Sequence, residues 1–421
     1  MKSLKLSFLI LLNFLFQYSE AQIHGVDNVI GKNYSISSKI LNQERDIQVY
    51  LPDGYKESNK EYPVLYILDG QWHFTNGVAI QKALRVPDLL PEMIIVGIKT
   101  ENPLRRQLMG NTPDKFHDFL QEDVISFIDK TFKTSQERIL FGWESAAFFS
   151  NYALLDEKQL FDGAIITNGA YASEDRVNTF SNLKLPKNKV LYIANSEKDI
   201  YYVGSSNHFT SFLEERKPHN LTWKYQKFDD EIHESLAYLA MYHGLRYYFH
   251  DFKSLVFSSI KEFIDLGGIP YLKNYFKTRG ERYGFPTEVD KSTKHSLIWL
   301  AWNRNDFEAF TLFMTEFNEM VETNESYDNA YWKNRFGQFY LKHNDIGNAL
   351  LYFNQGIDGY PDSREMAEMY AGLGAGYAMK KDKKNSIKCL KKAIAIAKQK
   401  EDEKLEDYKE QLVLLKKKKL N

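Results

Sequence analysis

The sequence predicts an α/β domain, with a mostly parallel sheet wrapped by helices, followed by an all-α array of helices. Short apolar runs alternate with helical periodicity up to about residue 250. From about Asp251 the runs of β-branched residues disappear, while helical periodicity continues to the end. A chain of 421 residues with 43% hydrophobic and 15% aromatic side chains can also fill two cores.

The first segment is typical of a secretory signal peptide. Lys2 and Lys5 precede an apolar run from Leu6 to Phe16, and Ser19-Glu20-Ala21 offers small residues at the cleavage positions. The apolar run is short for a transmembrane helix. We therefore expect residues 1–21 to be removed and the protein to be exported, either to the periplasm or to the medium.

Charge and cysteine content exclude several classes of function. The 55 Lys and Arg residues nearly balance the 56 Asp and Glu residues, so the net charge of -1 creates no field for nucleic acid or an anionic membrane. Cys389 is the single cysteine, which excludes an intramolecular disulfide. Histidines do not pair at metal-ligand spacing, and no glycine-rich phosphate motif follows a strand. We expect no metal, no nucleotide and no other cofactor.

Periodicity predicts the elements of the first domain in order. Residues 45–52 alternate apolar and polar side chains, as a half-exposed strand does, whereas residues 62–69 and 93–97 are nearly continuous apolar runs typical of strands covered on both faces. Apolar residues between Phe116 and Phe132 recur at helical steps and predict an amphipathic helix. Four more strands are expected, at residues 138–142, 163–167, 190–194 and 221–225.

Helix-breaking residues mark the boundary between the domains. Residues 266–270 and 284–286 contain glycine and proline and interrupt the helical pattern. We therefore expect the first domain to span residues 22–260, a linker or helical connection to span 261–295, and the helical array to span 296–421.

The helical part contains an internal repeat. Two units match in register, and residues 297–301 with Ala309 and Phe313 resemble a degenerate earlier unit. The offsets resemble the tetratricopeptide repeat, which implies contact with another protein or with the first domain. The alternative is an unrelated helical bundle. The matching positions are Phe336-Gly337, Tyr340, Ala349, Phe353 and Pro361 in one unit, and Tyr370, Leu373-Gly374, Tyr377, Ser386, Leu390 and Ala393 in the other.

A turn after the predicted strand at 138–142 has the context of a nucleophile elbow. In the G-x-S-x-G pattern, both outer positions must be small because the central residue occupies a strained turn between a strand and a helix. Gly142 and Ala146 meet that requirement, and a helix is expected over residues 148–155. The central position, however, is Glu144.

Two later segments supply a base and an acid in the order used by Ser-His-Asp hydrolases. His233 lies on a predicted loop after the last strand, where that order places the catalytic base. Acidic residues follow the strand at 190–194. Asp199 is the first choice for the acid and Glu197 the second.

These stretches together resemble the family of α/β-hydrolases called putative esterases, which includes enterochelin-type siderophore esterases and feruloyl esterases. The resemblance covers about residues 40–250 and implies an α/β-hydrolase fold and carboxylic-ester hydrolysis. It implies that His233 is the base, that Asp199 is the acid, and that backbone N–H groups near Gly70-Gln71 and at Ser145 form an oxyanion hole. The stretches that carry it are residues 49–55, 62–70, 96–98, 119–124 and 142–146, and His233 with residues 244–246.

The glutamate departs from the family pattern, and three interpretations follow. Glu144 and His233 could pair as carboxylate and imidazolium, leaving an impaired hydrolase whose cleft binds a ligand. Hydrolysis could instead persist, through Ser145 or through a water that Glu144 activates beside His233. The third interpretation is a coincidental loop or an unrelated activity. Partners expected on this basis are a small-molecule ester or related ligand, and a protein bound through the repeats.

Two further segments have open interpretations. Gly70, Gln71 and Trp72 follow a buried strand at the carboxyl edge of the sheet, where open α/β sheets place ligands, so we expect them to line the substrate cleft. The adjacent His73 either lines that cleft or packs in the core. Arg105 and Arg106 follow another strand and are interpreted as a solvated loop, the alternative being contact with an anionic or polar substrate.

Overall fold

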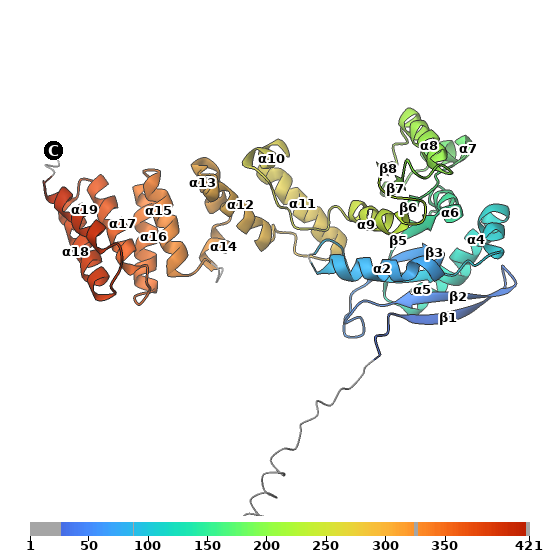
Figure 1. Cartoon of the computed structure of the whole chain (residues 1–421), viewed down its shortest axis with the longest axis horizontal. Coiled ribbons are helices and arrows are strands. Elements are labelled where there is room, and N and C mark those ends of the chain that lie inside the picture. The colour runs from blue at the N-terminus through green and yellow to red at the C-terminus, as the bar shows by residue number, and fades with distance from the viewer. Residues whose placement is uncertain (1–26, 87, 324–326, 418–421) are drawn as a thin grey trace, which may run out of the picture. The chain divides into compact units, whose positions relative to one another are not determined.

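The computed structural model describes residues 27–417 except residue 87 and residues 324–326. The chain folds into two compact units, of which the first ends at His250 and the second begins at Asp251 (Figure 1). The signal segment predicted over residues 1–21 lies outside the described residues. Within the described part of the chain, no helix combines the length and apolar character needed to cross a membrane.

The first unit is built on one mixed sheet, which has eight strands within the described residues, in the order β1-β2-β4-β3-β5-β6-β7-β8. β2 pairs antiparallel with β1 and β4, and all other neighbours are parallel. The predicted, mostly parallel sheet is therefore confirmed. The strands are β1 (Lys32–Ser38), β2 (Gln43–Tyr50), β3 (Tyr62–Leu68), β4 (Ile94–Ile98), β5 (Thr134–Trp143), β6 (Gly163–Thr167), β7 (Lys189–Asn195) and β8 (Leu221–Lys227).

Helices cover both faces of this sheet, which explains why β3, β4 and β6 are buried at every residue. Helices α2 and α9 contact each other on one face, where Gly77 lies against Ile67 and Gly244 against Ile165. The opposite face packs with Phe116, Phe119 and other apolar residues of the following helices. The helices are α2 (Gly70–Arg85), α3 (Leu104–Arg106), α4 (Pro113–Phe119), α5 (Ser126–Thr131), α6 (Ser145–Leu154), α7 (Glu174–Ser181), α8 (Val203–Arg216) and α9 (Leu236–Tyr248).

The predicted helix over residues 116–132 is not continuous. A π-helical segment, η2 (Leu120–Ile125), separates α4 from α5, and a similar segment, η1 (Gln107–Asn111), precedes α4. The expected helical periodicity is nevertheless present, because Phe116, Phe119 and Val124 are fully buried. Residues 70–72, interpreted from the sequence as lining the substrate cleft, begin α2, and His73, whose interpretation was left open, lies in the same first turn.

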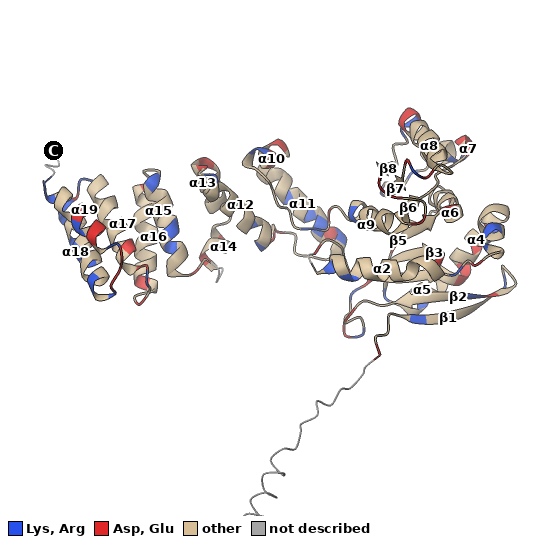
Figure 2. Ribbon diagram, in the orientation of Figure 1, with Lys and Arg blue, Asp and Glu red and all other residues tan. Residues whose placement is uncertain are grey.

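The second unit is entirely helical in its described residues, as predicted. Most successive helices contact one another, and several begin with an Asp or Asn side chain that accepts a hydrogen bond from the first turn, as at Asp306, Asp345 and Asp382. Lys and Arg are interspersed with Asp and Glu on the elements of both units (Figure 2). The helices are α10 (Ile260–Asp265), α11 (Gly268–Tyr283), α12 (Lys291–Asn303), α13 (Phe307–Glu316), α14 (Asn318–Thr323), α15 (Ala330–Lys342), α16 (Ile346–Gly359), α17 (Met366–Met379), α18 (Lys383–Gln399) and α19 (Leu405–Lys417).

Candidate functional site

Glu144 occupies a sharp turn between β5 and α6. Its backbone has φ 59° and ψ -119°, a conformation that costs a non-glycine residue about 1–3 kcal/mol. The turn needs small neighbours, because a Cβ atom on Gly142 would lie 2.2 Å from the carbonyl oxygen of Ala146. This geometry holds the Glu144 side chain above the carboxyl end of the parallel strands, where α/β sheets present ligand-binding groups.

The Glu144 carboxylate has two close partners. Its Oε2 atom accepts a hydrogen bond of 2.7 Å from Arg105 Nη1, and its Oε1 atom accepts one of 3.2 Å from the Tyr202 hydroxyl. Burial raises the pKa of Tyr202, and the charge of Glu144 raises it further, so the tyrosine remains a donor. The Glu144 side chain is still 24% exposed.

Arg105 is the central cation of the site, and its interpretation as part of a solvated loop was wrong. Its side chain is 7% exposed, and it binds the fully buried Asp69 through Nε at 2.9 Å and through Nη2 at 3.0 Å. Nη2 also donates to the carbonyl of Trp143 at 2.9 Å. Burial lowers the pKa of Arg105, but the hydrogen bonds and charges of Asp69 and Glu144 outweigh this effect and raise it.

Asp69 lies between the end of β3 and the start of α2. Its backbone is in the left-handed region, with φ 56°. Its Oδ1 atom also accepts a hydrogen bond from the hydroxyl of Thr100. One guanidinium therefore joins the ends of β3 and β5, because Asp69 follows the first strand and Glu144 the second.

His233 lies after β8 with Asp199 and Asn168 beside it. Its Nδ1 atom is 3.2 Å from Asp199 Oδ1, and Asn168 Nδ2 donates to Asp199 Oδ2 at 2.7 Å. The opposite ring nitrogen, Nε2, is 3.8 Å from Glu144 Oε1, beyond hydrogen-bond distance. The second candidate acid, Glu197, instead pairs with Lys227.

Aromatic rings surround His233. Trp143 has its ring centroid 5.0 Å from that of the imidazole, and Tyr202 stacks on the imidazole at 5.6 Å. Tyr201 meets it edge-on at 6.3 Å, and Trp72 meets Trp143 at 6.0 Å. These contacts fix the imidazole plane beside the Glu144 carboxylate.

The remaining predicted site residues lie at two helix N-termini. Gly70 and Gln71 begin α2, and Ser145 begins α6, where the first backbone N–H groups of a helix have no intrahelical acceptor. Within the described residues, the Ser145 hydroxyl forms no hydrogen bond with His233. Trp72 is 50% exposed, whereas His73 is buried between Phe141 and Trp143.

Several residues of the site gave no signal in the sequence. Asp69, Asn168 and Tyr202 were not identified, because each is an ordinary polar residue whose partners are 31–58 positions away. The position of Asp69 directly after a buried strand was the one usable clue. In the described part of the chain, no cluster of three or more His, Cys, Asp or Glu side chains is arranged to hold a metal ion.

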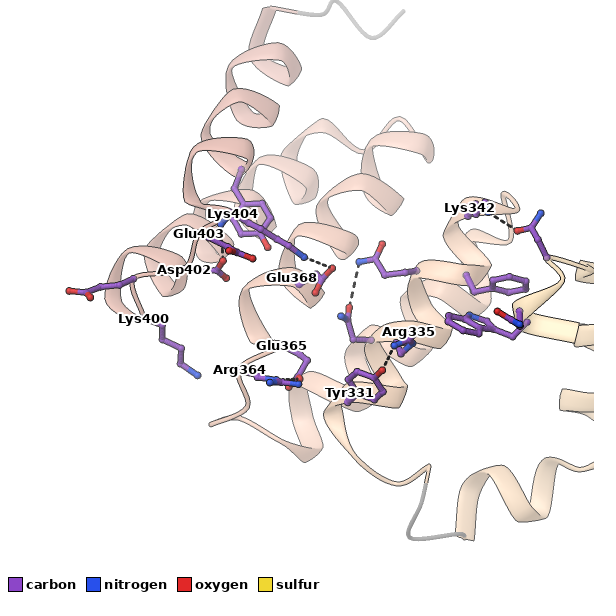
Figure 3. A pocket seen from close by; sticks show the side chains of 18 residues that line it. Tyr331, Arg335, Lys342, Arg364, Glu365, Glu368, Lys400, Asp402, Glu403 and Lys404 are labelled. Carbon is purple, nitrogen blue, oxygen red and sulfur yellow. Dashed lines mark hydrogen bonds and ion pairs between the residues drawn. The ribbon is translucent and has the colours of Figure 1, made fainter. Parts of the chain in front are cut away.

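A second candidate site is a groove of about 1010 Å³ in the helical unit (Figure 3). Arg335 stacks over the ring of Trp302 at 4.2 Å and donates to the Tyr331 hydroxyl. Among the described residues, neither Arg335 nor Lys342 pairs with a carboxylate, whereas Lys404 across the groove pairs with Glu368. Helix α15 contributes one face of residues at three- and four-residue steps: Tyr331, Asn334, Arg335, Gln338, Phe339 and Lys342.

Comparisons with known proteins agree with this fold. Residues 38–224 match the family model described as Putative esterase. The uncharacterized protein YbbA of Bacillus subtilis (strain 168) is 24% identical over 172 residues, which cover 37% of this chain and 69% of that protein.

Solved structures are similar at low identity. An uncharacterised protein from Capnocytophaga ochracea DSM 7271 superposes with a TM-score of 0.54 and 17% identity, covering 78% of this chain and 94% of that chain. An IroE-like serine hydrolase from Shewanella oneidensis has a TM-score of 0.49 and 20% identity, covering 68% of this chain and 98% of that chain.

Proposed function

Because the N-terminal unit is an esterase-like α/β-hydrolase domain, we propose that it descends from a carboxylic-ester hydrolase, cannot form an acyl-enzyme, and now binds a ligand. In this proposal Glu144 occupies the position of the ancestral nucleophile, His233 the position of the base and Asp199 the position of the acid. Gly70, Gln71, Trp72 and Ser145 form the former oxyanion and substrate region. The observation that carries the proposal is the hydrogen bond from Arg105 to Glu144.

The chemistry of a carboxylate supports this proposal. Acyl transfer requires a nucleophile whose proton passes to the base, and an ionised carboxylate has no such proton. Attack by Glu144 on an ester would give an anhydride. Each oxygen of Glu144 also accepts one hydrogen bond, from Arg105 or from the Tyr202 hydroxyl, and these donors draw electron density from the carboxylate and make it a poorer nucleophile.

A second candidate function is hydrolysis by a water between Glu144 and His233. The retained contact of 3.2 Å between His233 and Asp199 favours it, because such a pair orients an imidazole for proton transfer. Against it, Glu144 Oε2 already accepts a hydrogen bond from Arg105, and Glu144 Oε1 lies 3.8 Å from His233 Nε2, beyond hydrogen-bond distance. Ser145 is disfavoured as a nucleophile because it is one residue past the turn.

Ester turnover separates the two functions. The purified mature protein is to be assayed on p-nitrophenyl acetate together with the Glu144→Ser and His233→Ala variants. We expect no turnover by the natural protein, and we expect Glu144→Ser to gain activity that the double variant with His233→Ala lacks. Turnover by the natural protein that disappears with His233→Ala would refute the loss of catalysis.

We further propose that helices α15–α18 are two tetratricopeptide-like units. Equivalent contacts recur in both pairs of helices: Gly337 lies against Phe353, and Gly374 lies against Leu390. The small residue between them, Ala349 or Ser386, is fully buried in both. Such close helix packing through small residues is what the repeat requires.

The groove of the helical unit would bind a segment of a partner protein. The groove is lined by as many carboxylates as cations, but Arg335 and Lys342 lie together on α15 and have no carboxylate partner among the described residues, so this wall suits an acidic segment. Calorimetric titration of the intact protein with short acidic peptides should show binding that Arg335→Ala weakens. The control is Arg304→Ala, an exposed arginine outside the groove. Equal loss in both variants would contradict a role for the groove.

Export remains a proposal based on residues 1–21. It predicts that the protein accumulates outside the cytoplasm with an N-terminus near residue 22. N-terminal sequencing of the protein from cell fractions tests this, and an intact Met1 on a cytoplasmic protein would contradict it.

A further inference from the structure

We propose that Glu144 and the rings around His233 bind an organic cation with an apolar body, such as a primary amine or a quaternary ammonium compound. The inference rests on the proposed loss of acyl-enzyme chemistry, since Glu144 then serves to bind a ligand and not to react with it. It names the ligand class that the site accepts.

The first argument is the excess of negative charge. Asp69, Glu144 and Asp199 face one another across Arg105 and His233, so carboxylates outnumber cations even when the imidazole is protonated. A ligand of positive charge would relieve this excess, and an anionic ligand would increase it.

The second argument is that the excess charge is accessible at one atom. The side chains of Asp69 and Asp199 have no exposed surface, and each is held by its own partner. The Glu144 side chain is 24% exposed. Among the described residues, its Oε1 atom has only the Tyr202 hydroxyl within hydrogen-bond distance, and His233 Nε2 lies 3.8 Å away. An ammonium group can therefore contact Oε1 while Arg105 keeps Oε2.

The third argument is the aromatic surroundings. Trp143, Tyr201 and Tyr202 all lie within 6.3 Å of the His233 ring, measured between centroids. Aromatic faces attract cations through the ring quadrupole, with the largest effect where water is excluded. Of these residues, Tyr202 also donates to Glu144 Oε1, and the Trp143 ring already has the Arg105 guanidinium over it at 5.4 Å, so the rings at this position adjoin both a carboxylate and a cation.

Exposed apolar side chains extend from this position. Tyr201 and its neighbour Ile200 are 77% and 76% exposed, Ile232 beside His233 is 53% exposed, and Trp72 is 50% exposed. These side chains offer contact to the apolar body of a ligand. The segment that carries His233 also contains Asp229, Asp230 and Glu231, whose charges would attract cations toward the site.

Calorimetric titration of the full-length mature protein with benzyltrimethylammonium tests the inference, with benzyl alcohol and benzoate as the neutral and anionic comparisons. We expect the cation to bind at least about tenfold more tightly than either comparison, and Glu144→Gln to weaken it by about tenfold, the ratio that ~1.4 kcal/mol represents. Glu234→Gln, which removes an exposed acid from the same segment, should change affinity by less than about twofold.

Several results would overturn the inference: no binding of the cation, equal binding of benzyl alcohol or benzoate, or no effect of Glu144→Gln in a variant with an unchanged unfolding temperature. Ester turnover is measured separately on the same preparations. A natural protein that hydrolyses p-nitrophenyl acetate and still binds the cation through Glu144 would refute the proposed function but not the cation site.

Discussion

Arg105 satisfies two carboxylates at once, so its removal should be costly. With alanine at this position, Asp69 would be left fully buried without a counterion, although Thr100 would still donate to it. Removing one partner of a buried ion pair typically costs about 3–5 kcal/mol. We therefore expect Arg105→Ala to lower the free energy of unfolding, measured in urea, by about that amount.

The neighbouring Arg106 supplies the control for that measurement. It is exposed, and substitution of an exposed side chain usually changes stability by less than ~0.5 kcal/mol. Equal losses for Arg105→Ala and Arg106→Ala would contradict the central role assigned to Arg105.

His73 predicts a pH dependence of stability. Burial, and secondarily the charge of Arg105, lowers its pKa to about 4, whereas the unfolded chain titrates near 6.5. Between these values the unfolded state binds a proton that the folded state does not. The free energy of unfolding is therefore unaffected by protonation of His73 above pH 6.5. It falls by about 3 kcal/mol as the pH is lowered from 6.5 to 4, because the unfolded state gains the proton first.

The variant His73→Phe isolates this contribution. Neither ring nitrogen of His73 has a hydrogen-bond partner in the described structure, and its neighbours are Phe141 and Trp143, so phenylalanine should fit. We expect the natural protein to lose about 3 kcal/mol more than the variant between pH 6.5 and 4, in urea unfolding followed by circular dichroism. If the two proteins showed the same dependence of unfolding free energy on pH, the folded state would take up the proton of His73 as readily as the unfolded state does, and the prediction would be wrong.

The positions of candidate site residues were predictable where a family pattern fixes the order of groups, and they were not predictable where charge pairs join distant segments. Glu144, Asp199 and His233 stood out because each follows a strand in a known order. In the sequence nothing distinguishes Arg105 from Arg106, since burial of one and exposure of the other depend on Asp69 and Glu144, 36 and 39 residues away.

At the level of elements, the turn between β5 and α6 depends on the absence of a side chain at Gly142. A Cβ atom there would lie 2.2 Å from a backbone oxygen and 2.4 Å from the Ser150 hydroxyl, and the backbone cannot move without opening the helix. We expect Gly142→Ala to destabilise the protein by about 3 kcal/mol, at the upper end of overpacking effects.

Gly204 in α8 is the matched control, because nothing lies within 4 Å of the Cβ atom that alanine would add. Its replacement by alanine should change the free energy of unfolding by less than about 1 kcal/mol, and in the stabilising direction. If Gly142→Ala proved as harmless as Gly204→Ala, the turn would have to be more adaptable than its contacts indicate.

Seven of the strands were visible in the sequence, β2 from its alternation of apolar and polar residues and most of the others from apolar runs that report burial on both faces. β1 was not, since Lys32–Ser38 is polar at most positions and pairs only with β2 at the edge of the sheet. The interruption of the helix over residues 116–132 was also invisible. A π-helical turn shifts the register of the hydrogen bonds while keeping the apolar residues buried.

For the whole molecule, the division at residue 250 predicts independent folding. The first unit has its own sheet, the apolar cluster on one face of that sheet is drawn from residues up to Leu221, and the buried residues of α9 on the other face also precede residue 250. A chain ending near residue 260 should therefore stay soluble and unfold cooperatively in urea. An insoluble or molten product would mean that the helical unit completes the first core.

One ring in the helical unit has a consequence for the whole groove. Phe353 of α16 lies against the backbones of Gly337 in α15 and Gly372 in α17, and it is fully buried. Both of those helices supply walls of the groove, while α16 supplies none. The size of the Phe353 ring thus sets the spacing of α15 and α17 and, with it, the width of the groove. A substitution of Phe353 would therefore alter which partners fit, although Phe353 itself is buried and contacts none of them.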